Sequence, residues 1–113
     1  MIRVPEPDLD AVTGLSGSGP AYLFFVAEAL IDAGVAVGLA RDVSVALTTQ
    51  LLVGSAALLA RSGEPPDVLR QRVTSPGGTT AAGLKVLDAA GVADALRRAV
   101  SAATERSREL GAP

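Results

Sequence analysis

The long uncharged middle of this chain limits its possible folds more than any other feature. Residues 43–60, VSVALTTQLLVGSAALLA, contain no charged side chain, and residues 20–34 carry only Glu28 and Asp32. Helices that are apolar nearly all round are buried on most sides, and a small domain leaves a large fraction of its surface exposed. We therefore expect both segments to be buried against a second chain of the same kind.

A membrane-spanning helix is the competing interpretation of residues 43–60, because their length suits a bilayer. Thr48, Thr49, Gln50, Gly54 and Ser55 dilute the apolar stretch, and no aromatic belt flanks it. The opening residues, MIRVPEPDLD, contain no apolar signal segment. The sequence therefore favours a cytoplasmic protein without a membrane span.

Composition excludes several kinds of chemistry. The chain has no cysteine and no histidine, so disulfides, thiol metal sites and the usual nucleophile–base pairs are excluded, and no carboxylate cluster has metal-ligand spacing. The net charge is −2 and no basic tract appears, so no nucleic-acid partner is expected. No glycine-rich turn follows a strand, so no dinucleotide-binding Rossmann fold is expected.

Breaker residues divide the chain into about five helices and no strand, an all-α fold. Residues 1–13, with prolines at 5 and 7, are expected to form an extended lead-in, and SGSGP at 16–20 is expected to break the chain before the first helix. The helices are expected at about 20–34 or 20–38, 41–61, 68–73, 79–90 and 92–110.

The last expected helix is amphipathic and follows Gly91, which is expected to cap the helix before it. Its apolar side chains fall near one face, and Asp94 and Arg98 are spaced as an i,i+4 ion pair on another. The residues expected on the apolar face are Leu96, Val100, Ala103 and Leu110.

The segment VTSPGGTTAAGL, residues 73–84, predicts an open loop that runs into a helix. Gly77 and Gly78 leave backbone N–H groups accessible, and Thr79 and Thr80 add hydroxyls where free N–H groups and the helix dipole converge. Such a loop suits a carboxylate or a phosphate. The simpler alternative is that this segment only caps a helix after a Pro-Gly turn. The segment SGSGPAY has a similar pattern at the first helix, and there the simpler alternative is close helix packing.

Three segments together resemble one family: DAVTGLSGSGPAYLFFVAEALIDAGVAVGL, LRQRVTSPGGTTAAGL and the closing ERSREL. They are similar to the C-terminal helical dimerisation domain of pyrroline-5-carboxylate reductases over residues 4–110, so residues 1–113 are expected to form this domain. The resemblance implies NAD(P)H-dependent reduction of 1-pyrroline-5-carboxylate to L-proline, in proline biosynthesis. It also implies an intertwined homodimer or higher oligomer whose active site lies partly at the subunit interface.

The family also has an N-terminal Rossmann domain that binds NADP or NAD. That domain has no counterpart in this sequence, so the isolated chain is expected to hold no cofactor and to be inactive. A catalytically silent dimerisation module is the alternative function, and a generic small-anion binder is a third. The intact SPGGTT loop favours the reductase.

The resemblance assigns roles to individual residues. Ser75, Pro76, Gly77, Gly78, Thr79 and Thr80 form the substrate loop, whose N–H groups and hydroxyls receive the substrate carboxylate. Thr80 matches a threonine that hydrogen-bonds near the ring nitrogen and is the expected catalytic residue. Glu6 and Arg72 match positions near the dinucleotide. Gly63 stands where some relatives have a polar side chain that contacts substrate from the other protomer, so that contact is in doubt.

Overall fold

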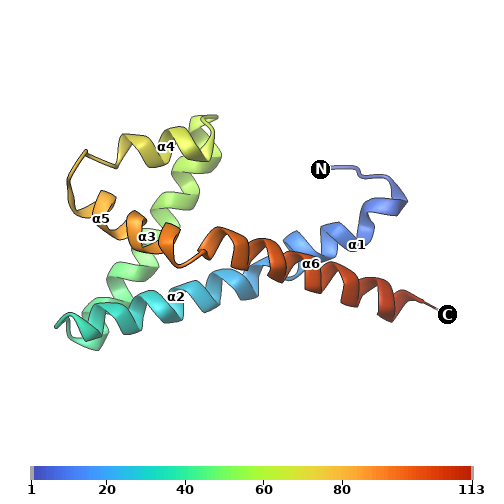
Figure 1. Cartoon of the computed structure of the whole chain (residues 1–113), viewed down its shortest axis with the longest axis horizontal. Coiled ribbons are helices and arrows are strands. Elements are labelled where there is room, and N and C mark those ends of the chain that lie inside the picture. The colour runs from blue at the N-terminus through green and yellow to red at the C-terminus, as the bar shows by residue number, and fades with distance from the viewer. Residues whose placement is uncertain (1, 113) are drawn as a thin grey trace. The chain divides into compact units, whose positions relative to one another are not determined.

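The computed structural model describes residues 2–112, and the helical elements follow one another with short connections (Figure 1). In chain order they are the 3-10 helix η1 (Glu6–Asp8), α1 (Leu9–Val12), the π-helical turn η2 (Thr13–Gly17), α2 (Gly19–Ala36), α3 (Arg41–Ser62), α4 (Pro66–Arg72), α5 (Thr79–Ala89) and α6 (Val92–Gly111). No strand occurs within residues 2–112. The all-α prediction is confirmed, and α2 to α6 begin and end near the expected residues.

The extended lead-in predicted for residues 1–13 is wrong from Glu6 onward, because helical structure begins there. Pro5 is extended, with φ −60° and ψ 146°, and Pro7 lies in the first turn of the helix that follows. A proline there loses no hydrogen bond, because the first N–H groups of a helix have no partner within it. Glu6 and Asp8 also lie where the helix dipole favours negative charge. The two prolines therefore start a helix here.

The break predicted at residues 16–20 is also wrong. The π turn η2 carries the chain onward, and the Ser18 N–H donates to the Thr13 carbonyl at 2.9 Å, so that helical structure runs from Glu6 to Ala36. The Tyr22 hydroxyl donates to the Gly14 carbonyl at 2.9 Å. The widened turn is thus stabilised by a side chain from α2.

Close packing between η2 and α6 explains the glycine at position 14. A Cβ at Gly14 would lie 2.9 Å from both the Thr104 amide nitrogen and the Val100 carbonyl oxygen. In the same contact region the Ser107 hydroxyl donates to the Asp10 carboxylate at 2.7 Å, and Figure 1 shows α1 beside α6. The glycine allows α6 to approach the N-terminal helical segment.

The corner between α2 and α3 uses the same device. Ser44 is 2% exposed, and its hydroxyl donates to the Ile31 carbonyl at 2.8 Å. A Cβ at Gly34 would lie 3.2 Å from the Ser44 Cβ. Gly38, with φ 110°, turns the chain between the two helices. Gly34 is therefore a packing position inside α2, whereas Gly38 marks the helix end.

The apolar face predicted for α6 is only partly turned inward. Val100 and Ala103 are half-buried, whereas Leu96 and Leu110 remain exposed. The predicted ion pair is present, with Arg98 Nε 2.9 Å from Asp94 Oδ2. The residues of α6 that meet Gly14 of η2 are Val100 and the buried Thr104.

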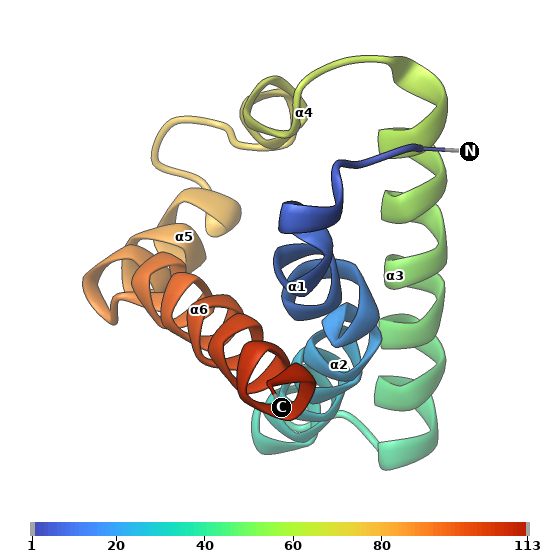
Figure 2. The same ribbon diagram turned by 90° about the vertical axis from the view of Figure 1, so that its right-hand side faces the viewer.

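The chain divides into two compact units, residues 1–23 with 87–113 and residues 24–86. In the first unit, α1 and η2 pack against α6; in the second, α3 is joined to α2 at one end and to α4 at the other (Figure 2). No large apolar side chain within residues 2–112 is buried, and the buried polar residues are Ser44, Thr48 and Thr104. The apolar surface of these helices is therefore largely uncovered.

Two helical stretches, Glu6–Ala36 and Arg41–Ser62, are long and apolar enough to cross a membrane by length and composition alone. Core helices of soluble proteins share these properties, so the two stretches are weak evidence for a span. The α3 stretch has polar residues in its middle, including Thr48, Thr49 and Gln50, which disfavour a lipid environment.

Candidate functional site

The loop from Ser75 to Gly78 turns the chain from α4 into α5. The Gly78 N–H donates to the Ser75 carbonyl at 3.0 Å and closes a four-residue turn. Gly77 has φ 71°, and proline followed by a glycine of positive φ is typical of a type II turn. A Cβ at Gly78 would lie 3.2 Å from the Ser75 carbonyl oxygen. The turn itself therefore requires the first glycine and leaves little room at the second.

Backbone donors gather where this turn meets α5. The first α5-type bond runs from the Ala82 N–H to the Gly78 carbonyl, at 3.2 Å. Within residues 2–112, the N–H groups of Gly77, Thr79, Thr80 and Ala81 donate no hydrogen bond to protein atoms. Thr79 and Thr80 are exposed. These donors, with the positive end of the α5 dipole, can receive a small anion.

The side-chain hydroxyls of residues 74–80 differ in whether they are hydrogen-bonded within the chain. The Thr74 hydroxyl donates to the Arg70 carbonyl at 2.5 Å and its N–H donates to the Gln71 carbonyl at 3.1 Å, so Thr74 closes the end of α4. The hydroxyls of Ser75, Thr79 and Thr80 form no hydrogen bond with another residue in the range 2–112. They remain available to a ligand.

Arg72 lies at the end of α4, close in sequence to the loop, and it has a carboxylate partner. Its Nη2 lies 3.1 Å from Glu64 Oε1, and the Glu64 N–H donates to the Ser62 hydroxyl at 3.1 Å. The ion pair therefore joins the end of α4 to the turn between α3 and α4. Sequence analysis missed Glu64, although its position just before the Pro-Pro start of α4 places it near the helix that carries Arg72.

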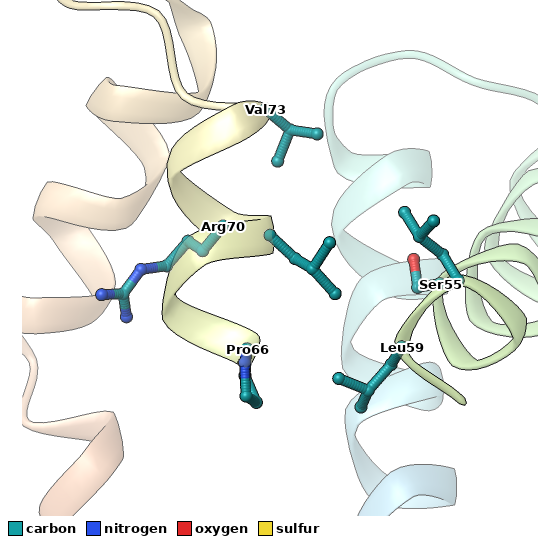
Figure 3. A pocket seen from close by; sticks show the side chains of 7 residues that line it. Ser55, Leu59, Pro66, Arg70 and Val73 are labelled. Carbon is teal, nitrogen blue, oxygen red and sulfur yellow. The ribbon is translucent and has the colours of Figure 1, made fainter. Parts of the chain in front are cut away.

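A hollow of about 270 Å³ lies between α3 and α4 (Figure 3). Figure 3 shows the Arg70 side chain extending away from Ser55 and Leu59, so its charge does not face the hollow. The lining residues are Ser55, Leu58, Leu59, Pro66, Leu69, Arg70 and Val73. Because this lining is mostly apolar and includes no residue of the loop, the hollow does not suit a carboxylate and is separate from the candidate anion site.

Residues 6–110 match the family model of the pyrroline-5-carboxylate reductase dimerisation domain. The chain belongs to this family. It is 49% identical over 110 residues to a pyrroline-5-carboxylate reductase of Arabidopsis thaliana and 52% identical over 108 residues to that of Pisum sativum. These alignments cover 97% and 96% of the chain but 40% of each relative. The chain thus spans about 40% of the length of the curated relatives it matches.

A solved structure of a pyrroline carboxylate reductase from Plasmodium falciparum, with NADP bound, matches this domain with a TM-score of 0.92 at 40% identity. A pyrroline-5-carboxylate reductase from Coxiella burnetii also matches, with a TM-score of 0.92 at 38% identity. Each match covers 96% of the chain, and the solved chains are covered to 44% and 40% respectively. The resemblance stated from the sequence and the all-α dimerisation fold are both confirmed.

The expected site residues of this reductase domain fall in both units. The loop residues 75–80 and Arg72 lie in the unit of residues 24–86, and Glu6 lies in the other unit, on η1. Gly63 has φ 68° and ends α3 in the left-handed conformation, where other residues are strained. It offers no side chain to a substrate. Within residues 2–112, no group of three or more His, Cys, Asp and Glu could hold a metal ion.

Proposed function

We propose that this chain is the substrate-binding and dimerisation part of a pyrroline-5-carboxylate reductase, which reduces 1-pyrroline-5-carboxylate to L-proline in proline biosynthesis. Membership of the dimerisation family over residues 6–110 supports this assignment. The observation that carries it is the set of open N–H donors at the start of α5. Every helix start has such donors, and what distinguishes this one is the glycine turn and the three free hydroxyls beside them, which a dimerisation module without catalytic activity does not require.

The substrate carboxylate binds at the loop in this proposal. The N–H groups of Gly77, Thr79 and Thr80 donate to its oxygens, and hydrogen bonds to a charged acceptor are stronger than those to a neutral one. Ser75 and Thr79 add hydroxyl donors, while Pro76 and Gly78 hold the turn that presents them. The binding energy orients the five-membered ring, which leaves its imine carbon open to attack.

Thr80 is the proposed catalytic residue. Its hydroxyl lies on the first turn of α5 and has no protein partner within residues 2–112, so it can hydrogen-bond near the ring nitrogen. Reduced NADP or NAD supplies the hydride when it is bound. A protonated imine is already electrophilic, so the protein's task is positioning rather than acid–base chemistry. This agrees with a chain that has no histidine.

Arg72 and Glu6 are proposed to contact the dinucleotide. The Arg72 guanidinium suits a phosphate, provided that it exchanges or shares its bond to Glu64. The exposed Glu6 carboxylate can accept hydrogen bonds from ribose hydroxyls but repels phosphate. Each side chain is thus matched to a different chemical group of a dinucleotide, the Arg72 guanidinium to phosphate and the Glu6 carboxylate to ribose hydroxyls.

A homodimer or higher oligomer in the cytoplasm is the proposed assembly. Leucine, valine and phenylalanine side chains of α2 and α3 remain exposed, and an interface with a second copy would remove them from water. Intertwined helices from two chains would supply the core that each chain lacks by itself.

Binding of L-proline to the uniformly ¹⁵N-labelled chain tests the proposed site. The amide signals of Gly77, Thr79 and Thr80 are expected to shift with a dissociation constant of about 1 mM or weaker, or about −4 kcal/mol. Pyrrolidine is the matched control, because it has the ring without the carboxylate. Equal shifts with both ligands, or none with proline, would contradict a carboxylate site at this loop.

A further inference from the structure

Glu64 lies in the short connection between α3 and α4, and its neighbours fix its backbone. Gly63 ends α3 with φ 68°, and the Glu64 N–H donates to the Ser62 hydroxyl at 3.1 Å. Pro65 follows in the extended conformation, with φ −62° and ψ 149°, and a proline restricts the residue before it to extended conformations. The backbone of Glu64 is therefore held in place just before α4.

The Glu64 carboxylate holds the Arg72 side chain along α4. This helix runs from Pro66 to Arg72 and spans about 10 Å, so the two charged residues belong to opposite ends of it. The Arg72 Nη2 nevertheless lies 3.1 Å from Glu64 Oε1. The direction agrees with the tilt of helical side chains toward the N-terminus. The guanidinium therefore extends back toward the start of α4.

The loop of residues 75–80 follows the other end of α4. Figure 3 shows Pro66 and Val73 at opposite ends of this helix, and the chain passes from Val73 into the loop. Arg72 is the basic residue nearest to the loop in sequence. Its side chain is 59% exposed, so close packing does not prevent it from turning toward the loop. The ion pair with Glu64 is the interaction that opposes such a turn.

A guanidinium at the loop would change which anions the loop prefers. A phosphate group carries about −1.5 to −2 charges near neutral pH and no positive charge of its own. In 1-pyrroline-5-carboxylate the ring nitrogen is bonded to the carbon that carries the carboxylate, so the protonated imine places a positive charge beside the anionic group. A guanidinium attracts phosphate more strongly than this ligand. Keeping the guanidinium away from the loop therefore favours the substrate over phosphate.

We infer that Glu64 is a positioning residue that sets the anion preference of the substrate loop. It binds the Arg72 guanidinium toward the start of α4 and so favours a carboxylate beside a positive nitrogen over a phosphate. This inference rests on the proposed carboxylate site and adds the residue that makes the site selective. Arg72 can still contact a dinucleotide phosphate by sharing its donors with Glu64.

The size of the effect follows from the exposure of the ion pair. The Glu64 side chain is 39% exposed, less than that of Arg72, and ion pairs in contact with water contribute little free energy. The pair therefore weakens the binding of phosphate to the loop by about two- to fivefold. Specificity is a difference of affinities, so the effect is measured as the ratio of the dissociation constants of two ligands.

Titration of the uniformly ¹⁵N-labelled chain with inorganic phosphate and with L-proline, at one pH and one ionic strength, tests the inference. L-Proline has a positive ring nitrogen beside its carboxylate, as the protonated substrate does. In Glu64→Gln we expect the dissociation constant for phosphate, from the loop amide signals, to fall about two- to fivefold, and that for L-proline to change by less than about twofold. Phosphate should also shift the Arg72 Nε–H signal more than in the wild type. An unchanged ratio of the two dissociation constants would overturn the inference.

Control variants show whether the effect passes through Arg72. Adding Arg72→Gln to Glu64→Gln should restore the wild-type ratio, whereas adding Arg70→Gln should not.

Asp67→Asn removes the same charge from an exposed residue in the first turn of α4. Within the described residues Asp67 has no ion-pair partner, so this variant should keep the wild-type ratio. An equal change in Asp67→Asn and Glu64→Gln would show a general effect of charge and overturn the inference. A wild-type chain whose loop signals do not respond to L-proline would contradict the proposed function as well. A wild-type response to L-proline with no effect of Glu64→Gln would contradict the role of Glu64 alone.

Discussion

Gly14 on η2 and Thr104 on α6 meet without space for a β-carbon between them. A Cβ at Gly14 would lie 2.9 Å from the Thr104 amide nitrogen. That atom belongs to the backbone of α6, so it cannot move aside as the end of a flexible side chain could. Thr104 is itself buried, with its hydroxyl 2.7 Å from the Val100 carbonyl. This contact sets how closely the N-terminal helical segment lies to α6.

Gly14→Ala is accordingly expected to destabilise the protein by about 1–3 kcal/mol, the usual cost of overpacking a close contact. Urea unfolding at fixed protein concentration measures the change, since the stability of a dimer depends on concentration. Gly19→Ala is the matched control, because a Cβ there meets nothing within 4 Å. Equal stabilities of the two variants would show that α6 can shift to accept the methyl group.

Tyr22→Phe tests the support of the π turn. The change removes the hydroxyl that donates to the Gly14 carbonyl, and we expect a loss of about 0.5–1.5 kcal/mol in the free energy of unfolding. Ser16→Ala is the control, because the Ser16 hydroxyl donates to the Val12 carbonyl within the same exposed turn. Faster amide exchange across Thr13–Gly17 in Tyr22→Phe, but not in Ser16→Ala, would mark Tyr22 as the stabilising contact. Identical exchange in both would contradict it.

The long helices were predictable because their boundaries carry strong local signals. Three helix boundaries are marked by glycines of positive φ, Gly38, Gly63 and Gly91. The helix ends predicted from the sequence lie within a few residues of each. The N-terminal segment was not predictable in the same way. Prolines 5 and 7 suit an extended chain or a first helical turn equally well, so the local sequence does not decide between the two.

Buried polar contacts were also beyond sequence reasoning. Nothing in the pattern of α3 separates Ser44, which is buried against α2, from Ser55, which lines an open hollow. The pairing of Arg72 with Glu64 likewise depends on how α4 folds back beside the turn before it. The loop at residues 75–80, by contrast, could be anticipated, because proline and glycine impose its geometry locally.

Arg72→Gln is expected to raise the KM for NADPH about two- to fivefold in a full-length relative that carries this change at the corresponding position. The effect is modest because the side chain is exposed and partly neutralised by Glu64. Arg70→Gln is the control in the same helix. A KM for NADPH that stays unchanged in Arg72→Gln, or rises equally in both variants, would show that the Arg72 side chain does not contact the dinucleotide.

Thr80→Val replaces the hydroxyl of Thr80 with a methyl group at nearly constant shape. In a full-length relative we expect kcat/KM for 1-pyrroline-5-carboxylate to fall about tenfold or more, or about 1.4 kcal/mol of transition-state stabilisation. The free energy of unfolding should change by less than about 1 kcal/mol, because no protein hydrogen bond of this hydroxyl is lost within residues 2–112. Thr80→Ser keeps the hydroxyl and should retain most activity. Thr79→Val removes the neighbouring hydroxyl, so comparing its kcat/KM with that of Thr80→Val distinguishes the contributions of the two hydroxyls. If Thr80→Val keeps the wild-type kcat/KM, the Thr80 hydroxyl has no catalytic role and Thr80 serves only to start the helix. The backbone N–H groups of the loop would then orient the substrate.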